Sequence, residues 1–268
     1  IHRPELAPLV RLLRPRAKVT LIVHTNLSKQ VGPGSDSLWR FFKNLYFLLE
    51  SFFLKFPDQV IAHTAKDGPR LREKFPNLEV VAGWYNDDHF GVSQPRQERT
   101  GVIWVGRFEQ VKDPLLAVAA FAAPQLKSHE SLTLLGSGSL YGLIEREIRD
   151  KKLGDTVFLS DPVESDQLGK ILNRYRLLLH TSHFEGSPRV ILEALACGLV
   201  VVTLPECDPD GWLLKTGAGV YATVRSPEAV SAAVLAAPDL KPSVVAQSIR
   251  SRSASSVVVG LEELIRGV

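Results

Sequence analysis

The sequence predicts an α/β fold in which parallel strands alternate with helices. In residues 177–205 a short apolar run, a polar turn of sequence EGSP, a helical pattern and a second apolar run follow one another, which is the order of a βαβ unit. The same succession of strand, turn and helix returns from Val102 onward. A chain of 268 residues with 45% hydrophobic content can bury a sizeable core and is long enough for one domain or two.

The helix of this βαβ unit has recognisable boundaries. Ser187 can cap it, Pro188 suits the first helical position because its missing N–H needs no partner there, and Gly198 suits the end. Glu185 then lies in the turn before the helix, and Glu193 lies inside it. Both carboxylates are near a helix N-terminus, whose free N–H groups and positive dipole end suit a phosphorylated ligand.

Glu193 is the one acidic residue in an otherwise apolar helix, and a carboxylate that is buried there needs a partner. An ion pair with Arg189, four residues earlier, is one interpretation, worth a few tenths of a kcal/mol if the pair is exposed. Hydrogen bonds from the hydroxyls of a ligand are the other. Spacing alone does not decide between them.

The spacing of Glu185 and Glu193, followed by EALACG and a strand, resembles the E-x7-E element of family-four retaining glycosyltransferases of the GT-B fold. The resemblance implies two Rossmann-like domains with parallel sheets, of which the second binds most of the sugar donor. It also implies that Glu185 contacts the donor sugar and that Glu193 contacts the nucleotide ribose. The neighbouring residues that it adds to the donor site are Gly186, Ser187, Arg189 and Val190.

The first part of the chain is predicted to hold three strands and two helices. Their ranges are 18–25, 59–64 and 78–82 for the strands, and 38–56 and 66–75 for the helices. The helix of residues 38–56 is expected to be a core helix rather than a membrane-surface helix, because its polar stripe is narrow and not uniformly basic. His24, at the end of the first strand, matches the "HT" that the family places near the reacting sugar, although a histidine at a strand end can equally be structural. The segment GWYNDDHF resembles the family's NG-x-D-x-x-x-F loop, with Asp87 in place of the glycine.

The expected domains are residues 1–97 on the acceptor side and residues 98–268 on the nucleotide-sugar side. The polar stretch from Ser93 to Thr100 is the expected linker. The resemblance places Ile1 partway through the first domain, so that domain is expected to be incomplete.

The first strand of the second domain ends at Gly106 and Arg107, and Asp113 with the following proline begins a helix. Arg107 and Lys112 are therefore two cations between a strand's carboxyl end and a helix N-terminus, a position that suits a pyrophosphate. Loops at strand ends also carry Lys and Arg for no functional reason. The segment GRFEQVKDP resembles the family's GR-x5-K element, which implies that Arg107 and Lys112 hold the donor diphosphate, with Gly106 beside them.

Gly136 and Gly138 follow the next strand, Leu132 to Leu135, and are half of a dinucleotide-binding fingerprint. A hydride-transfer enzyme is nevertheless disfavoured, because Tyr141 stands where the third glycine belongs and Asp155, the expected acidic residue, falls in a loop. In the resembling family the same Gly-x-Gly is a close backbone approach to the sugar donor.

Residues 157–160 match a family strand that meets the nucleobase, which brings Phe158 into the donor site. Asp208-Pro209-Asp210 looks like an Asp-x-Asp metal motif, but Asp and Pro both favour turns. No metal and no cofactor are expected. The expected donor substrate is a UDP- or GDP-sugar.

Residues 1–60 carry nine Lys and Arg against four acidic residues, which makes this end of the chain basic. It is a candidate surface for an anionic membrane or an anionic acceptor, whereas its dispersed charges disfavour nucleic acid. The sequence shows no apolar run of ~20 residues and no signal-peptide pattern, and two cysteines suggest a reducing compartment. The expected location is cytoplasmic, with peripheral contact at the inner membrane surface.

The resemblance, together with these features, implies a retaining glycosyltransferase that moves a sugar from a nucleotide-diphosphate sugar to an unidentified acceptor. Two alternatives stay open. A nucleotide-sugar epimerase or hydrolase of the same fold needs acid and base carboxylates of its own in the first domain, and a non-catalytic nucleotide-sugar-binding module would fit a chain with an incomplete first domain.

Overall fold

The computed structural model describes residues 6–23, 41–62, 79–80, 83–183, 185, 187–208 and 211–266. Internal contacts divide the chain into two compact units, Ile1–Gly83 and Trp84–Val268. The division falls before the expected linker, and the roles predicted for the two domains stay predictions, as does the incompleteness of the first.

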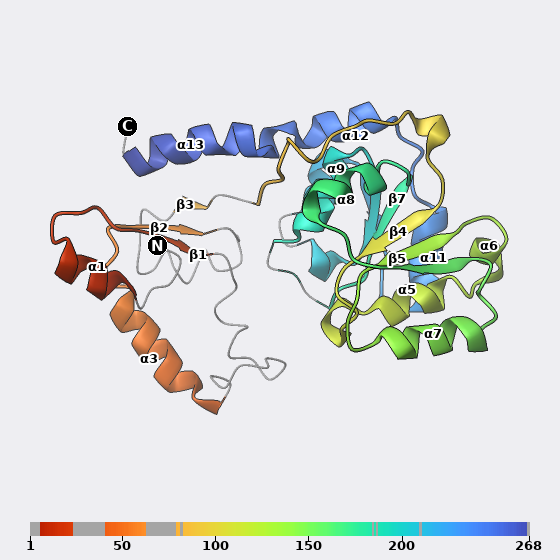
Figure 1. Cartoon of the computed structure of the whole chain (residues 1–268), viewed down its shortest axis with the longest axis horizontal. Helices are drawn as coiled ribbons and strands as arrows, with labels where there is room; N and C mark the ends of the chain where they lie inside the picture. Colours follow the sequence, from red (N-terminus) through yellow and green to blue (C-terminus); the bar gives the residue numbers. More distant parts are fainter. Residues whose placement is uncertain are drawn as a thin grey trace. The chain divides into compact units, whose positions relative to one another are not determined.

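The first unit contains a parallel sheet of order β1-β2-β3 (Thr20–Val23, Gln59–Ala62, Glu79–Val80) and the helices α1 (Ala7–Leu13) and α3 (Lys43–Phe53) (Figure 1). The Asp58 carboxylate organises this unit, because it accepts a hydrogen bond from the Val19 N–H (2.6 Å) and pairs with Arg11. These contacts tie α1 to the edge where β1 and β2 begin. The predicted helix of residues 66–75 lies outside the described residues.

The prediction that residues 38–56 form a core helix is wrong for α3. Leu45, Leu48 and Phe52 are 47%, 67% and 50% exposed. They recur at a helical spacing and so form one exposed stripe, while Glu50 and Leu54 are buried. A helix rich in apolar residues need not be buried on every face. Here the apolar composition predicted more buried surface than α3 has.

The second unit holds a six-stranded parallel sheet among its described residues, of order β6-β5-β4-β7-β8-β9. All strand pairs are parallel, which confirms the predicted α/β arrangement. The strands are β4 (Val102–Val105), β5 (Leu132–Leu135), β6 (Val157–Ser160), β7 (Leu177–His180), β8 (Val200–Thr203) and β9 (Gly219–Tyr221). The chain runs outward from β4 to β6 and then returns to β7 beside β4, so the order reverses between these two central strands.

Helices cover both faces of this sheet, with α8, α9 and α12 on one face and α5, α7 and α11 on the other (Figure 1). Their bounds are α5 Pro114–Ala120, α7 Tyr141–Asp150, α8 Ser165–Leu172, α9 Arg189–Ala196, α11 Pro227–Leu235 and α12 Pro242–Ile249. The smaller helices are α6 (Pro124–Lys127) and α10 (Trp212–Thr216), and α13 (Ala254–Arg266) follows α12. Trp104, Phe108 and Phe121 are the largest apolar side chains of the core between the sheet and α5. None of the described helices is long and apolar enough to cross a membrane.

The polar stretch from Ser93 to Thr100 packs against the second unit. Arg99 is only 2% exposed, and it donates hydrogen bonds to Asn173 Oδ1 (2.6 Å) and to the carbonyl of Cys197 (2.8 Å). The Asn173 amide oxygen also accepts from the N–H of Ser93 (2.8 Å). These buried contacts explain why the stretch belongs to the second unit, although its composition resembles that of a linker.

Asp87, which replaces the glycine of the family's loop, has a partner that is distant in the sequence. Its carboxylate accepts hydrogen bonds from the N–H of Ser255 (3.1 Å) and from the Ser255 hydroxyl (2.5 Å), at the start of α13. A carboxylate here satisfies free N–H groups at a helix N-terminus. The departure from the family's pattern therefore ties this loop to the C-terminal helix.

The βαβ unit of residues 177–205 is confirmed as β7, α9 and β8, with β7 and β8 paired in parallel. Gly198 adopts φ +81° just after the helix, as expected of a helix stop. The predicted cap is wrong. The helix begins at Arg189, Pro188 is its N-cap residue, and no side chain caps it, which leaves the Ser187 hydroxyl for another use.

Candidate functional site

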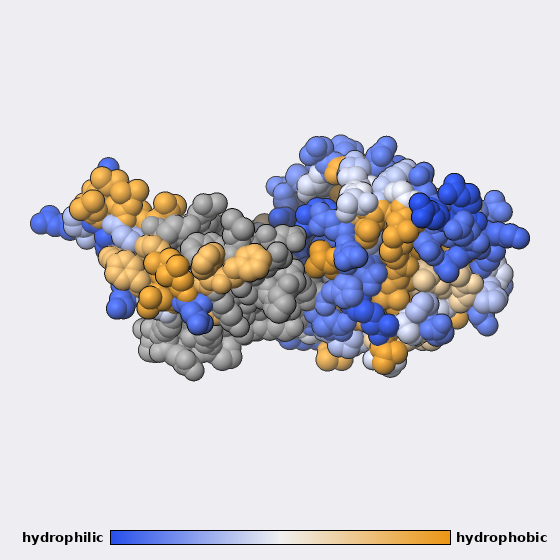
Figure 2. Space-filling view, turned by 90° about the horizontal axis from the view of Figure 1, so that it is seen from below, coloured by the Kyte–Doolittle hydropathy of each residue, from blue (hydrophilic) through white to orange (hydrophobic). Residues whose placement is uncertain are grey.

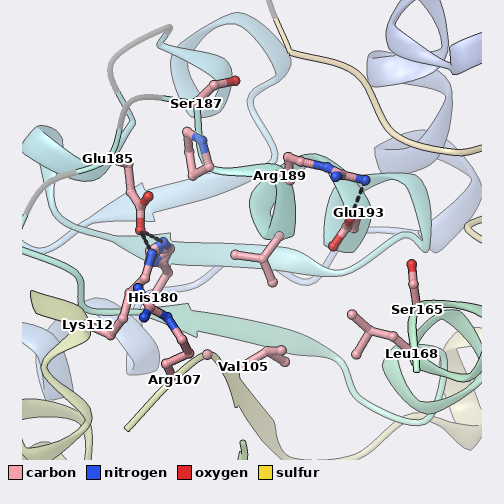
Figure 3. A pocket seen from close by; sticks show the side chains of 13 residues that line it. Val105, Arg107, Lys112, Ser165, Leu168, His180, Glu185, Ser187, Arg189 and Glu193 are labelled. Atoms are coloured by element: carbon pink, nitrogen blue, oxygen red, sulfur yellow. Dashed lines mark hydrogen bonds and ion pairs between the residues drawn. The ribbon is translucent and has the colours of Figure 1, made fainter. Parts of the chain in front are cut away.

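A cavity of about 460 Å³ opens at the carboxyl edge of the second unit's sheet, where the strand order reverses between β4 and β7. In open α/β sheets this is where ligands bind, because the loops after the two strands diverge there. The lining residues are Val105, Gly106, Arg107, Lys112, Ser165, Leu168, His180, Glu185, Ser187, Pro188, Arg189, Val190 and Glu193 (Figure 3). They come from the loop after β4, from α8, and from the segment between β7 and the middle of α9.

One end of the cavity is organised around Oε1 of Glu185. Lys112 Nζ and the Ser182 hydroxyl both donate hydrogen bonds to this oxygen, each at 2.6 Å. His180 Nε2 lies 3.1 Å from it, in a geometry that makes no hydrogen bond. Figure 3 shows Lys112 and His180 converging on Glu185. The sequence placed Lys112 and Glu185 in one site, and the structure brings them into direct contact.

His180 is an uncharged group in this cluster at neutral pH. Burial lowers its pKa to about 4, although the adjacent Glu185 carboxylate acts in the opposite direction. The sequence analysis did not single out His180. A signal was present in the sequence, since the pair His180-Thr181 repeats the His-Thr pair noted at His24-Thr25.

The other end of the cavity is organised around Glu193. Glu193 is 7% exposed, and burial raises the pKa of its carboxyl. Arg189 Nη2 lies 3.7 Å from Glu193 Oε1, so the ion pair expected from the sequence exists, but the Arg189 side chain is 67% exposed. An ion pair with an exposed partner contributes ~0.2–1 kcal/mol, which is too little to account for a buried carboxylate. Ser165 and Leu168 of α8 lie opposite (Figure 3).

Arg107 lines the cavity from the side of β4. Its guanidinium pairs with Glu109 at 2.8 Å, and the arginine side chain is 68% exposed. Because the pair is solvent-exposed it is weak, and the guanidinium can turn to a ligand at little cost. Arg107 and Lys112 thus give the cavity two cations from one loop.

Ser187 carries a buried hydroxyl in the cavity wall. Its Oγ has no hydrogen-bond partner within the part of the chain that the structure describes. Buried polar atoms are seldom left in this state. A hydroxyl that neither caps α9 nor pairs with a neighbour is available to a ligand.

Gly136, Gly138 and Phe158 do not line this cavity. A Cβ on Gly136 would lie 1.9 Å from the Gly106 carbonyl oxygen, and one on Gly138 would lie 2.5 Å from the carbonyl oxygen of Phe108. The two glycines therefore let the loop after β5 approach the loop after β4. Phe158 is 46% exposed on the edge strand β6. Their donor contacts stay predictions.

The loop after β7 is fixed by residues that the sequence analysis did not identify. Arg225 donates to the Thr181 carbonyl (2.7 Å) and pairs with Asp113 (3.0 Å) and Glu206 (2.9 Å). The Thr181 hydroxyl accepts from Trp104 Nε1 (2.9 Å). Asp113 also caps α5, as predicted, by accepting from the Leu116 N–H. No local sequence pattern predicts this role of Arg225, because its partners are far away in the sequence.

Asp208 of the Asp-x-Asp segment is buried and structurally engaged. Its carboxylate accepts from the N–H groups of Trp212 (2.9 Å) and Leu213 (2.8 Å) and from the Tyr221 hydroxyl (2.7 Å). It therefore holds the start of α10. No group of three or more His, Cys, Asp and Glu that could hold a metal occurs among the described residues.

His24 and Gly186 lie outside the described residues, so their predicted roles stay predictions. Besides His180, the cavity residues that sequence reasoning did not assign to the site are Val105, Ser165, Leu168 and Pro188. Ser165 and Leu168 come from α8, whose packing beside α9 is a tertiary feature without a local sequence signal.

Residues 86–247 match the family of glycosyl transferases group 1. The chain belongs to this family. A curated relative, the poly(glycerol-phosphate) alpha-glucosyltransferase of Bacillus subtilis (strain 168), is 34% identical over 125 residues, which are 46% of this chain and 18% of the relative. The match thus spans less than a fifth of that relative's length.

Similar solved structures cover nearly all of this chain. They are sucrose-phosphate synthase from Thermosynechococcus elongatus (TM-score 0.75, 18% identity, 99% of this chain and 72% of that one), the pneumococcal O-GlcNAc transferase GtfA (0.73, 17%, 97% and 54%) and Anabaena HepE (0.74, 14%, 99% and 76%). Identities this low establish the fold alone. The predicted class, an α/β fold of GT-B type with parallel sheets, is confirmed.

Proposed function

We propose that this chain carries the sugar-donor site of a retaining glycosyltransferase, which moves a sugar from a nucleotide-diphosphate sugar to an acceptor hydroxyl. The observation that carries the proposal is the cavity beside β4 and β7, which is lined by two cations of one loop, Arg107 and Lys112, and by two carboxylates, Glu185 before α9 and Glu193 within it. Membership of the glycosyl transferases group 1 family supports the reaction type.

In this proposal Arg107 and Lys112 bind the diphosphate next to the N-terminus of α9. Negative charge grows on the leaving diphosphate as the glycosidic bond breaks, so cations held there stabilise the transition state more than the ground state. The positive charge comes from the protein, and the proposal invokes no metal or cofactor. Glu185 accepts hydrogen bonds from hydroxyls of the transferred sugar, and Glu193 accepts them from hydroxyls of the ribose. The Ser187 hydroxyl is a further hydrogen-bonding group of the site.

A uridine nucleotide is the first donor to consider. The solved structures of GtfA and HepE hold UDP together with GlcNAc and glucose, respectively. A GDP-sugar fits the same polar groups, because they contact phosphate, ribose and sugar rather than the base. The acceptor is unidentified. The curated relative's name makes poly(glycerol-phosphate) the first acceptor to assay.

A thermal-shift screen with UDP-glucose, GDP-mannose and ADP-glucose tests the donor site. We expect one of them to stabilise the chain by ~2–3 kcal/mol at a hundred times its dissociation constant. Free glucose and free mannose serve as controls and should leave the melting temperature unchanged. Absence of a shift with every nucleotide sugar would count against the proposal.

We also propose that the first unit contacts the surface of an anionic membrane at its inner, cytoplasmic side. Helix α1 exposes Leu9, Leu12 and Leu13, and Figure 2 shows apolar side chains gathered over the described part of this unit. Arg14 and Arg16, which follow α1, are exposed as well. Exposed apolar groups beside cations are what binding to an anionic lipid surface requires.

Sedimentation with vesicles tests this contact. We expect binding to phosphatidylserine-containing vesicles that falls steeply as salt rises, because exposed charges are screened beyond ~8 Å at physiological ionic strength. Leu12→Glu should weaken it, whereas Leu214→Glu should not, although Leu214 of the second unit is equally exposed (79% against 77%). Salt-insensitive binding to neutral vesicles would instead assign the contact to the apolar face alone.

A further inference from the structure

His180 has a feature that the proposed function leaves unexplained. It ends β7, is 6% exposed and lines the cavity, yet its Nε2 has no hydrogen-bond partner among the residues described. Its main chain is held firmly, since the Thr203 hydroxyl donates to its carbonyl (2.8 Å). A buried ring nitrogen that is aimed at a cavity and left unpaired is unusual enough to require a reason.

The contacts of Glu185 supply that reason. Lys112 and Ser182 donate to its Oε1, His180 Nε2 lies 3.1 Å from the same atom, and Oε2 accepts no hydrogen bond from the described residues. One oxygen is therefore crowded and the other is left for a ligand. Figure 3 shows the carboxylate with a single oxygen engaged.

Lys112 has two roles in the proposed function, since the cation that pairs with Glu185 is also one of the two that bind the diphosphate. When its ammonium turns to the phosphates, Oε1 loses its charged partner. Ser182 stays in place, and His180 Nε2 is close enough to replace Lys112 after a small rotation of the ring.

We propose that His180 is a positioning residue, which holds Glu185 toward the sugar once Lys112 has turned to the diphosphate. The inference rests on the proposed function. In the tautomer that carries its proton on Nε2, the neutral ring donates one hydrogen bond to Oε1 and leaves Oε2 for a sugar hydroxyl.

The charges around the ring favour a neutral donor. The ionisable groups facing His180 are Glu185 from the turn before α9, Lys112 from the loop after β4, Arg225 from the segment before α11, and Asp208 from the segment before α10. A protonated His180 would be a third cation beside Lys112 and Arg225. Because burial keeps the ring neutral, it can orient Glu185 without competing for the carboxylate as a charged group.

Calorimetry with the nucleotide sugar that gives the largest shift in the screen, and with its bare nucleotide diphosphate, tests the inference. His180→Leu should weaken binding of the nucleotide sugar about tenfold and leave that of the diphosphate within twofold. His180→Gln, whose amide nitrogen falls near the position of Nε2, should restore the affinity to within about threefold. Ser182→Ala removes the other uncharged donor to Oε1 and should reproduce the selective loss.

Tyr175→Phe is the matched control, because it deletes a partly buried hydrogen bond to the Thr133 hydroxyl (3.0 Å) away from the cavity and should change neither affinity. Equal weakening of both ligands by His180→Leu, or no weakening of either, would overturn the inference while leaving the proposed function intact. If His180→Leu does not fold, the affinities of His180→Gln and Ser182→Ala test the inference in its place. A Ser182→Ala protein that loses affinity for both ligands equally, or for neither, overturns the inference. If the unaltered chain binds no nucleotide sugar, the proposed function fails as well.

Discussion

Gly136→Ala should destabilise the second unit by about 3 kcal/mol and abolish measurable nucleotide binding. The added Cβ would lie 1.9 Å from the Gly106 carbonyl oxygen, a distance that no relaxation of side chains can relieve. Overpacking of this kind costs ~1–3 kcal/mol and occasionally more, and here the clash is with backbone. The loop after β4 must therefore move, and it carries Arg107 and Lys112, the two cations of the cavity.

Gly142→Ala is the matched control for this substitution. Gly142 lies in α7 only a few residues away, and a Cβ there would meet nothing within 4 Å. Replacing a helical glycine by alanine should stabilise the chain by ~0.5–1 kcal/mol and leave binding unchanged. Thermal unfolding and nucleotide calorimetry on both variants give the comparison. A Gly136→Ala protein with the melting temperature and affinity of the parent chain would contradict the close approach of the two loops.

Local patterns predicted the second unit well because its strands are short apolar runs between turns. The strand predicted at residues 132–135 from its apolar run is β5, and the strand at residues 157–160, predicted from the family resemblance, is β6, both with the same bounds. The helix stop at Gly198 was also readable, because a left-handed residue is needed there. The start of α9 was misjudged, since Ser187 has the right chemistry for a cap but faces the cavity instead.

The structural features that could not be predicted from the sequence depend on contacts between residues far apart in the chain. Arg99 looked like part of a polar linker, and only its contacts with Asn173 and Cys197 reveal that it is buried. The exposed stripe of α3 was missed for the opposite reason, because apolar periodicity does not tell how much partner surface is present. Only part of the lining of the cavity was predicted. Its loops carry recognisable motifs, but Ser165 and Leu168 of α8 enter it through tertiary packing.

Substitution of the two cavity carboxylates should produce different binding patterns. Glu185→Ala removes the group proposed to receive the sugar and at the same time releases Lys112, which pairs with it at 2.6 Å. The nucleotide sugar should therefore bind about tenfold or more weakly, by the ~1.5–3 kcal/mol of hydrogen bonds to a charged group. The bare nucleotide diphosphate should bind as well as before or slightly better, since the freed ammonium can turn to the phosphates.

Glu193→Ala should instead weaken both ligands alike, again by ~1.5–3 kcal/mol, because both contain the ribose that Glu193 is proposed to hold. Stability gives an independent check. The folded-state pKa of Glu193 is raised by burial, so the stability linked to its protonation is present below its unfolded pKa and is lost as the pH rises through the folded value. The charged form is therefore a cost at neutral pH, and Glu193→Gln should not lower the melting temperature there.

Calorimetry of a nucleotide sugar and of its nucleotide diphosphate against the parent chain, Glu185→Ala and Glu193→Ala is the most direct test that this cavity is the sugar-donor site. The expected result is a selective loss of the nucleotide sugar for Glu185→Ala and an equal loss of both ligands for Glu193→Ala. A Glu193→Ala protein that melts at a lower temperature but keeps both affinities would show that Glu193 only forms an ion pair with Arg189. That result would contradict the assignment of the cavity as the sugar-donor site.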